Sequence, residues 1–274
     1  MTLFQAIIAS IVGVFSEIYP IAPGAHQSLL EYFFGWNVSH PRLQGAVEFG
    51  VFLSLIFTLR HDILSHISSF IQVVVYRKKP RAMDEKMPIF ILIGVVAPIA
   101  AFFLFRQSPI LPSENALLFA AVFGLSGLPM AFFDYYAKKT KAIYDWNLPD
   151  AVLVGIGCVS LVIPELGRTL GAFTVAGARG YKREGAAKVI LYFATPILGV
   201  SAWYHLKGPG AALSVSEFPP LYYWVSLAVA FLSATFFIHV FLSSIQKTPL
   251  LRYAVYRILV AATVIGVHFY RAGL

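Results

Sequence analysis

The chain has 274 residues, of which 58% are hydrophobic and only 12% are charged. Soluble domains carry roughly 25% charged residues, so this chain lacks the charge that would keep a soluble domain of its size in water. The composition therefore excludes a soluble enzyme and indicates an integral membrane protein. Cys158 is the only cysteine, which also excludes an intrachain disulfide and a site with several cysteine ligands.

The formal net charge of +8 does not point to nucleic acid as a partner. The basic residues fall in short clusters between apolar runs, at 77–86, 138–141, 179–183 and 247–257. Cytoplasmic loops of membrane proteins carry such clusters, with anionic lipid headgroups as the natural counter-charge. We therefore expect membrane lipids as partners and no nucleic acid.

In chain order, the first apolar stretch, 3–36, is interrupted by the turn-forming run "PIAPG". A shorter stretch at 63–76 is flanked by charges and predicts a partly interfacial helix. A second interrupted stretch, 149–178, contains "PELGR". Uninterrupted runs of about 20 residues, enough to cross a bilayer, lie at 43–60, 88–106, 116–135, 187–205, 220–244 and 253–272.

The basic clusters predict how these segments are oriented. If 138–141 and 179–183 are both cytoplasmic, the stretch 149–178 must enter and leave the membrane on the same side. Counting back from Arg60 on the inside makes 3–36 a second re-entrant pair, entering from the outside. The loops at 107–114 and 207–218 are then external. Two broken helix pairs are expected to meet near the bilayer midplane.

A weak internal repeat supports this arrangement. The runs "GVFSEIYP" (13–20) and "GCVSLVIP" (157–164) share G-x-x-S-x-x-x-P, each just before a re-entrant tip. We therefore expect an all-α integral membrane protein of two inverted-topology halves, 1–142 and 143–274, that form one membrane domain. In such proteins the broken helices mark the binding site, because irregular backbone at that depth is tolerated only where it is buried in protein or lines a cavity.

The two tips resemble the motifs of the undecaprenyl-diphosphate phosphatase family. The run "GVFSEIYPIAPGAH" (13–26) resembles that family's E-G-x-x-E-F-L-P-V-S-S-T-G-H, and "IPELGRTL" (163–170) resembles its I-P-G-T-S-R-S-G. The stretches "VEFGVFLSLIFTLRHDI" (47–63) and "GYKREGAAKVILYFATP" (180–196) resemble further parts of the family pattern. The resemblance implies a multi-pass protein of a bacterial-type inner membrane, acting on the C55 lipid carrier of cell-wall synthesis, with a site that opens outward.

The resemblance also implies site residues. Glu17, His26 and Arg168 match the second glutamate, the histidine and the arginine of the motifs, and would be catalytic if the protein is active. Mg²⁺ or Ca²⁺ would then be the expected cofactor, although Glu17 alone is a thin ligand set, because Gly13 replaces the first glutamate.

A polar cavity at the tips is expected from the residues themselves, because ionisable groups inside a membrane are costly and by default functional. Arg168 could clamp a phosphate bidentately. Glu165, three residues earlier, would share a helical face with Arg168 and pair with it if the segment is helical there. The expected substrate-binding residues are Arg168, His26, Glu17, Glu48, Glu165 and Thr169.

Two functions remain open from the sequence. Ala22, Pro23 and Gly167 stand where the motifs carry serines, so the tips lack the carboxylate pair and the hydroxyls. This favours a protein that binds a polyprenyl phosphate with little turnover, as a carrier, a transporter or a subunit with a partner membrane protein or a second copy. The alternative is an active undecaprenyl-diphosphate phosphatase with a reduced site.

Overall fold

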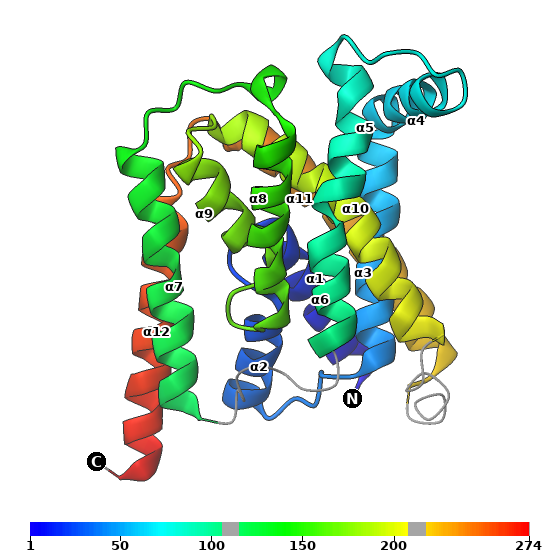
Figure 1. Ribbon diagram of the computed structural model, residues 1–274. Coiled ribbons are helices and arrows are strands. Elements are labelled where there is room, and N and C mark those ends of the chain that lie inside the picture. The colour runs from blue at the N-terminus through cyan, green and yellow to red at the C-terminus, as the bar shows by residue number, and fades with distance from the viewer. Residues whose placement is uncertain (106–114, 208–217, 274) are drawn as a thin grey trace.

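The computed structural model describes residues 1–105, 115–207 and 218–273, and its regular elements there are helices (Figure 1). The expected all-α class is confirmed. In chain order the elements are α1 (Leu3–Ile18), α2 (Pro23–Phe34), α3 (Pro41–Thr58), α4 (Arg60–Val74), α5 (Met83–Gly94), α6 (Val96–Phe105), α7 (Ala116–Tyr136), η1 (Ile143–Asp145), α8 (Leu148–Cys158), η2 (Val159–Val162), α9 (Arg168–Ala178), α10 (Arg183–Lys207), α11 (Pro220–Ser244) and α12 (Leu251–Ala272).

The helices agree with the apolar runs. In the described part of the chain, five helical segments are long and apolar enough to cross a membrane: Met83–Phe105, Ala116–Tyr136, Arg183–Lys207, Pro220–Ser244 and Leu251–Ala272. A sixth candidate is α3, which is followed after an 80° bend by α4. No residue of α4 is fully buried, as the expected interfacial helix requires. The chain is a multi-pass integral membrane protein.

Two helix pairs are broken rather than continuous, and both breaks have the same local cause. A residue before proline is pushed out of the helical region and into extended backbone. Tyr19, before Pro20, has φ −86° and ψ 155°, and ends α1. Ile163, before Pro164, has φ −108° and ψ 109°, and ends η2. After the first break the chain turns back as α2, and after the second break it turns back as α9.

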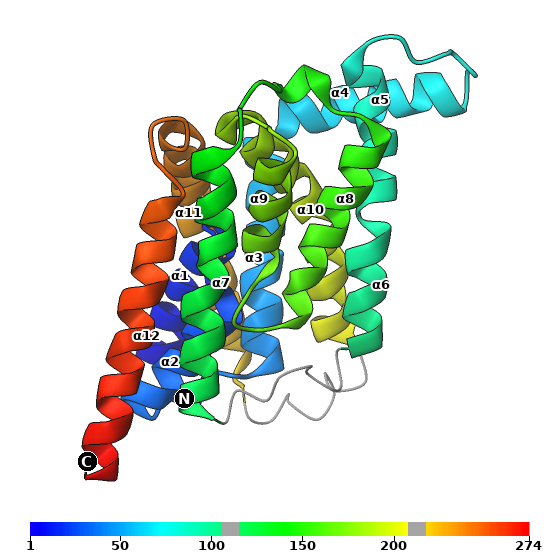
Figure 2. The same cartoon turned by 60° about the vertical axis from the view of Figure 1, so that its left-hand side comes forward.

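The α1–α2 pair and the α8–α9 pair approach from opposite ends of the molecule and touch at their breaks (Figures 1 and 2). The Ala25 N–H donates to the Pro164 carbonyl at 3.1 Å. A Cβ on Gly24 would lie only 2.8 Å from Pro164 Cβ, so a side chain there would push the two tips apart. Gly167, at φ +70°, lies against Ala22 in the same way.

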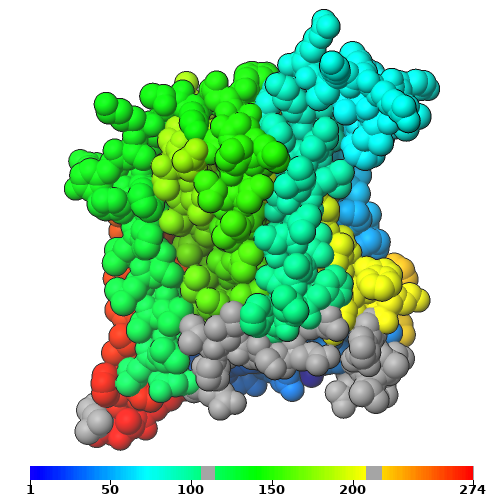
Figure 3. Space-filling model, in the orientation of Figure 1, coloured from blue at the N-terminus to red at the C-terminus, as the bar shows by residue number. Residues whose placement is uncertain are grey.

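The basic loops gather at one end of the molecule. Lys141 N–H donates to Gly180 O at 3.0 Å, and Lys182 N–H donates to Lys141 O at 2.9 Å, so the segments 138–141 and 179–183 lie side by side as expected. The α4–α5 connection projects at the same end (Figure 3). The α2–α3 connection lies at the opposite end. The expected external loop at 107–114 lies wholly outside the described residues, and so does the loop at 207–218 apart from its two end residues.

This arrangement predicts the result of cysteine labelling in intact cells. Asn37, Lys138 and Lys182 are exposed, whereas the native Cys158 is buried and silent. A membrane-impermeant maleimide should modify Asn37→Cys directly. It should modify Lys138→Cys and Lys182→Cys only after the membrane is permeabilised. Labelling of 138 and 182 from opposite sides would contradict the fold.

Candidate active site

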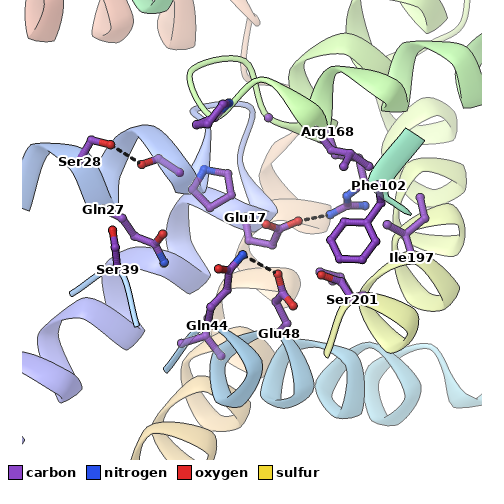
Figure 4. Close-up of a pocket in the computed structure, with 18 residues that line it drawn as sticks. Glu17, Gln27, Ser28, Ser39, Gln44, Glu48, Phe102, Arg168, Ile197 and Ser201 are labelled. Atoms are coloured by element: carbon purple, nitrogen blue, oxygen red, sulfur yellow. Dashed lines mark hydrogen bonds and ion pairs between the residues drawn. The ribbon is translucent and has the colours of Figure 1, made fainter. Parts of the chain in front are cut away.

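A pocket of about 340 Å³ lies where the two breaks meet. Its walls come from α1, α2, α3, α6, η2, α9 and α10, together with the turn before α9 and the α2–α3 connection. The apolar part of the wall is formed largely by Phe102, Ile197 and Leu198. Figure 4 shows the polar side chains that line it, which are Glu17, Gln27, Ser28, Ser39, Gln44, Glu48, Arg168 and Ser201.

An ion pair joins the two broken helix pairs inside this pocket. Arg168 Nη2 lies 2.5 Å from Glu17 Oε1, and the two side chains are only 4% and 14% exposed. The Nη1 atom of Arg168 is buried and has no hydrogen-bond partner. Leaving such a donor unpaired costs free energy, more so for a charged group. The guanidinium thus pairs with Glu17 through Nη2, while its Nη1 has no acceptor.

Two helices begin at the pocket. Pro23 and Gly24 open α2, and Arg168 opens α9 after Gly167; all four residues line the cavity. The first N–H groups of a helix have no intrahelical acceptor and carry the positive end of the helix dipole, which favours bound anions. Pro23 contributes no N–H. The starts of α2 and α9 and the Arg168 guanidinium therefore lie together in the pocket.

The opposite wall carries a second polar cluster. Glu48 accepts a hydrogen bond from Gln44 Nε2 at 3.1 Å through Oε1, and its Oε2 lies 2.9 Å from His205 Nδ1. The structure thus brings Glu48 into the same pocket as Glu17 and Arg168. The partner His205 was not predicted, because the two residues lie on different helices and 157 positions apart.

His26 does not share this pocket. Its Nδ1 lies 2.8 Å from the Ala22 carbonyl and its Nε2 lies 2.6 Å from the Tyr256 hydroxyl. The ring is buried, stacked on Tyr256 and edge-on to Phe123. The ring thus points toward Phe123 on α7 and Tyr256 on α12, away from Glu17 and Arg168. A catalytic role for His26 stays a prediction, and its geometry is that of a residue that fixes the start of α2.

Glu165 lies in the turn before α9, whereas Thr169 lies in the first turn of that helix. Because helix α9 begins only at Arg168, the expected helical pairing of Glu165 with Arg168 does not form, and Arg168 pairs with Glu17 instead. The Oε2 atom of Glu165 is buried without a partner. Thr169 Oγ1 donates to the Glu17 carbonyl at 3.0 Å. Thr169 therefore joins α9 to α1 and holds Arg168 and Glu17 next to each other.

Arg257 lies in the protein interior, contrary to the expectation that it belongs to a basic loop. Its place in the basic cluster 247–257 predicts a loop residue, but the side chain is fully buried in α12. It donates to the Phe123 carbonyl at 2.9 Å and to Ser126 Oγ at 2.8 Å, both on α7. It also donates to the carbonyls of Pro20 and Glu165, one on each tip. Arg257 therefore fastens both breaks to α7 and α12.

The donor set does not fit a resident Mg²⁺ or Ca²⁺. Within the described ranges, no group of three or more His, Cys, Asp or Glu side chains is placed to hold a metal ion. Such hard cations take oxygen ligands, mainly carboxylates, and the Glu17 carboxylate is already engaged by Arg168. We therefore derive no step through a protein-bound metal.

The family follows from comparison with known proteins. The model of the family described as bacitracin resistance protein BacA matches residues 6–263. The chain belongs to the BacA family. This confirms the resemblance carried by the two tip motifs, and with it a family of membrane lipid phosphatases.

Relatives of this BacA family member match it along nearly its whole length. An undecaprenyl-diphosphatase of Moorella thermoacetica is 26% identical over 272 residues, covering 99% of this chain and 100% of its own. One of Geotalea daltonii is 27% identical over 270 residues, covering 94% and 95%. Undecaprenyl-diphosphatase 1 of Pseudoalteromonas translucida is 23% identical over 265 residues, covering 97% and 98%.

Proposed function

We propose that this protein is a phosphatase that hydrolyses a polyprenyl diphosphate to the lipid monophosphate and inorganic phosphate. The proposal rests on the Arg168 guanidinium, whose Nη2 pairs with Glu17 and whose Nη1 has no acceptor. This group lies beside two helix N-termini in the pocket. A site of this kind suits the terminal phosphate of a lipid diphosphate. The names of the relatives favour hydrolysis over the binding-only function that the altered motifs favour.

Binding uses the charges of the resting site. Arg168 is neutralised by Glu17 when no ligand is present, so the buried cation is not left uncompensated. A phosphate carries more negative charge and more acceptor oxygens than a carboxylate, and it gains the Gly24 N–H on α2 and the N–H groups at the start of α9 as well. The phosphate competes with Glu17 for Nη2, and the unpaired Nη1 gains an acceptor once the guanidinium turns toward the phosphate.

Catalysis in this site depends on positioning and charge stabilisation, as is general for phosphoryl transfer. Positions 22, 23 and 167 carry no hydroxyl, and no described hydrogen bond joins the hydroxyls of Ser28, Ser39 and Ser201 to a carboxylate or a histidine that could activate them. We therefore assign the attack on the terminal phosphorus to water. The bond from that phosphorus to the bridging oxygen breaks, and its electron pair leaves with the lipid monophosphate. Arg168 and the helix N-termini stabilise the negative charge on the transferred group.

The pocket opens to the outside of the inner membrane in this proposal. Ser39, in the α2–α3 connection, lines the pocket at the end opposite to the basic loops, which are cytoplasmic under the positive-inside rule. The isoprenoid next to the diphosphate lies against Phe102, Ile197 and Leu198, which form an apolar wall. The rest of the tail extends into the bilayer.

Phosphate release from purified protein tests the proposal. With C55 and C15 diphosphates, Mg²⁺ present throughout, we expect release at about 1 s⁻¹ or faster, the ordinary range of enzymes. The same preparation is tested for binding of the C55 monophosphate. Saturable binding of the lipid with no release above a no-enzyme control would refute the proposal and establish the binding-only function.

A further inference from the structure

We propose that Glu48 is the general base of this site and that His205 positions it. This inference rests on the proposed hydrolytic function, and it assigns the group that takes the proton from the attacking water. Glu48 touches the reacting water, so it is a catalytic residue. His205 acts through Glu48.

The geometry separates the two carboxylates of the pocket into different tasks. Glu17 is held at 2.5 Å by Arg168, so the guanidinium already compensates its charge and occupies one of its oxygens. Glu48 contacts no arginine or lysine among the described ion pairs. Its side chain lies on the wall facing Glu17 and Arg168, directed into the same space (Figure 4). Of the two, Glu48 is the carboxylate whose charge no guanidinium compensates, and this makes it the better proton acceptor.

The neighbours of Glu48 fix its orientation. Gln44, one helical turn earlier on α3, donates to Oε1, and His205 on α10 lies against Oε2. The side chains of Glu48 and His205 are only 12% and 14% exposed, so this contact is shielded from bulk water. A base held by a second group within hydrogen-bond distance, and directed at the reacting atoms, is the arrangement that general-base catalysis requires.

Small residues make room for the cluster. A Cβ on Gly45 would lie 3.0 Å from His205 Cβ, so this glycine lets α3 and α10 approach closely enough for the contact with Glu48. On the facing wall Gly13 has no side chain, and a Cβ there would lie 3.4 Å from Val47 Cγ1, beside Glu48.

The proposed step balances. The oxygen of a water molecule bonds to the terminal phosphorus while one of its protons moves to the Glu48 carboxylate. The bond between that phosphorus and the bridging oxygen breaks, and the electron pair leaves on the lipid monophosphate. Glu48 then releases the proton to bulk water through the pocket mouth, which regenerates the carboxylate.

The test compares Glu48→Gln with wild type. The amide keeps the shape of the side chain but accepts no proton, so kcat should fall by about 10²- to 10⁴-fold. The KM for the C15 diphosphate and the affinity for its methylene-bridged analogue, which cannot be hydrolysed, should stay within threefold. His205→Gln should lower kcat by about tenfold with the same unchanged affinity. Asp62→Asn, which makes the same chemical change at the Lys188 ion pair outside the pocket, should leave both constants unchanged.

Each outcome decides one claim. Wild-type protein that releases no phosphate overturns the proposed function. If wild type releases phosphate and Glu48→Gln keeps its kcat within threefold, the hydrolytic function stands and the assignment of Glu48 falls. A Glu48→Gln protein that also loses analogue binding and monodispersity would show a structural role, and would equally overturn the assignment.

Discussion

Replacement of Arg168 with alanine should lower the kcat for phosphate release by about 10³-fold or more, because it removes the main cation that stabilises the charge of the transferred phosphate. The change also leaves Glu17 as a buried carboxylate without its ion-pair partner. Affinity for the methylene-bridged diphosphate analogue should fall in parallel. Both quantities are measured on protein purified in detergent, by phosphate release and by isothermal titration.

A matched substitution separates charge from geometry at this position. Arg168→Lys keeps the positive charge but loses the planar fork, so it should bind the analogue more weakly than wild type and restore only part of kcat. Arg252→Ala, at an exposed position of α12, should leave both values unchanged. If Arg168→Ala keeps more than a tenth of the wild-type kcat, the phosphate does not bind at this arginine.

The second large effect concerns stability. Arg257→Ala should lower the free energy of unfolding by about 3 kcal/mol or more, because it leaves two buried acceptors unpaired at once, each costing about 1–3 kcal/mol. The acceptors are the carbonyls of Pro20 and Glu165, whereas the Phe123 carbonyl still accepts from Ser126 Oγ. For a chain of this size that corresponds to a melting temperature lower by roughly 6–12 °C. Thermal denaturation followed by tryptophan fluorescence measures the shift.

The same variant should also lose phosphate release at temperatures where it is still folded. Pro20 and Glu165 belong to the two tips, so without Arg257 each tip loses its hydrogen bond to the α12 side chain that joins it to α7. Arg252→Ala again serves as the control, and it should melt within about 1 °C of wild type, as is usual for exposed substitutions. An Arg257→Ala protein that melts like wild type would show that the tips are held by other contacts.

The architecture could be predicted from the sequence because membrane proteins obey few and strong rules. Apolar runs of about 20 residues mark spans, and basic clusters mark the cytoplasmic end. Pro20 and Pro164 break helices for a local reason that the sequence displays directly. Glu17 and Arg168 were expected in one cavity, and they form its central ion pair. The division into halves at 1–142 and 143–274 stays a prediction.

Contacts between helices could not be predicted in the same way. His26 lies four residues after Ala22 and points to Tyr256 rather than into the pocket, and nothing in the local sequence decides between the two directions. The pairing of Glu48 with His205 depends on how closely α3 approaches α10. Arg257 could have been recognised, because an arginine six residues into the apolar run "LRYAVYRILV" is expected to face the protein interior.

The most direct test of the account is a structure of the protein bound to the methylene-bridged C15 diphosphate analogue, determined in lipid nanodiscs. We expect the terminal phosphonate within hydrogen-bond distance of Arg168 Nη1, between the first turns of α2 and α9. The carboxylate of Glu17 should then be displaced from its contact with Nη2, and Glu48 should face the phosphorus. A diphosphonate bound elsewhere, with the Glu17–Arg168 ion pair still closed, would contradict the account.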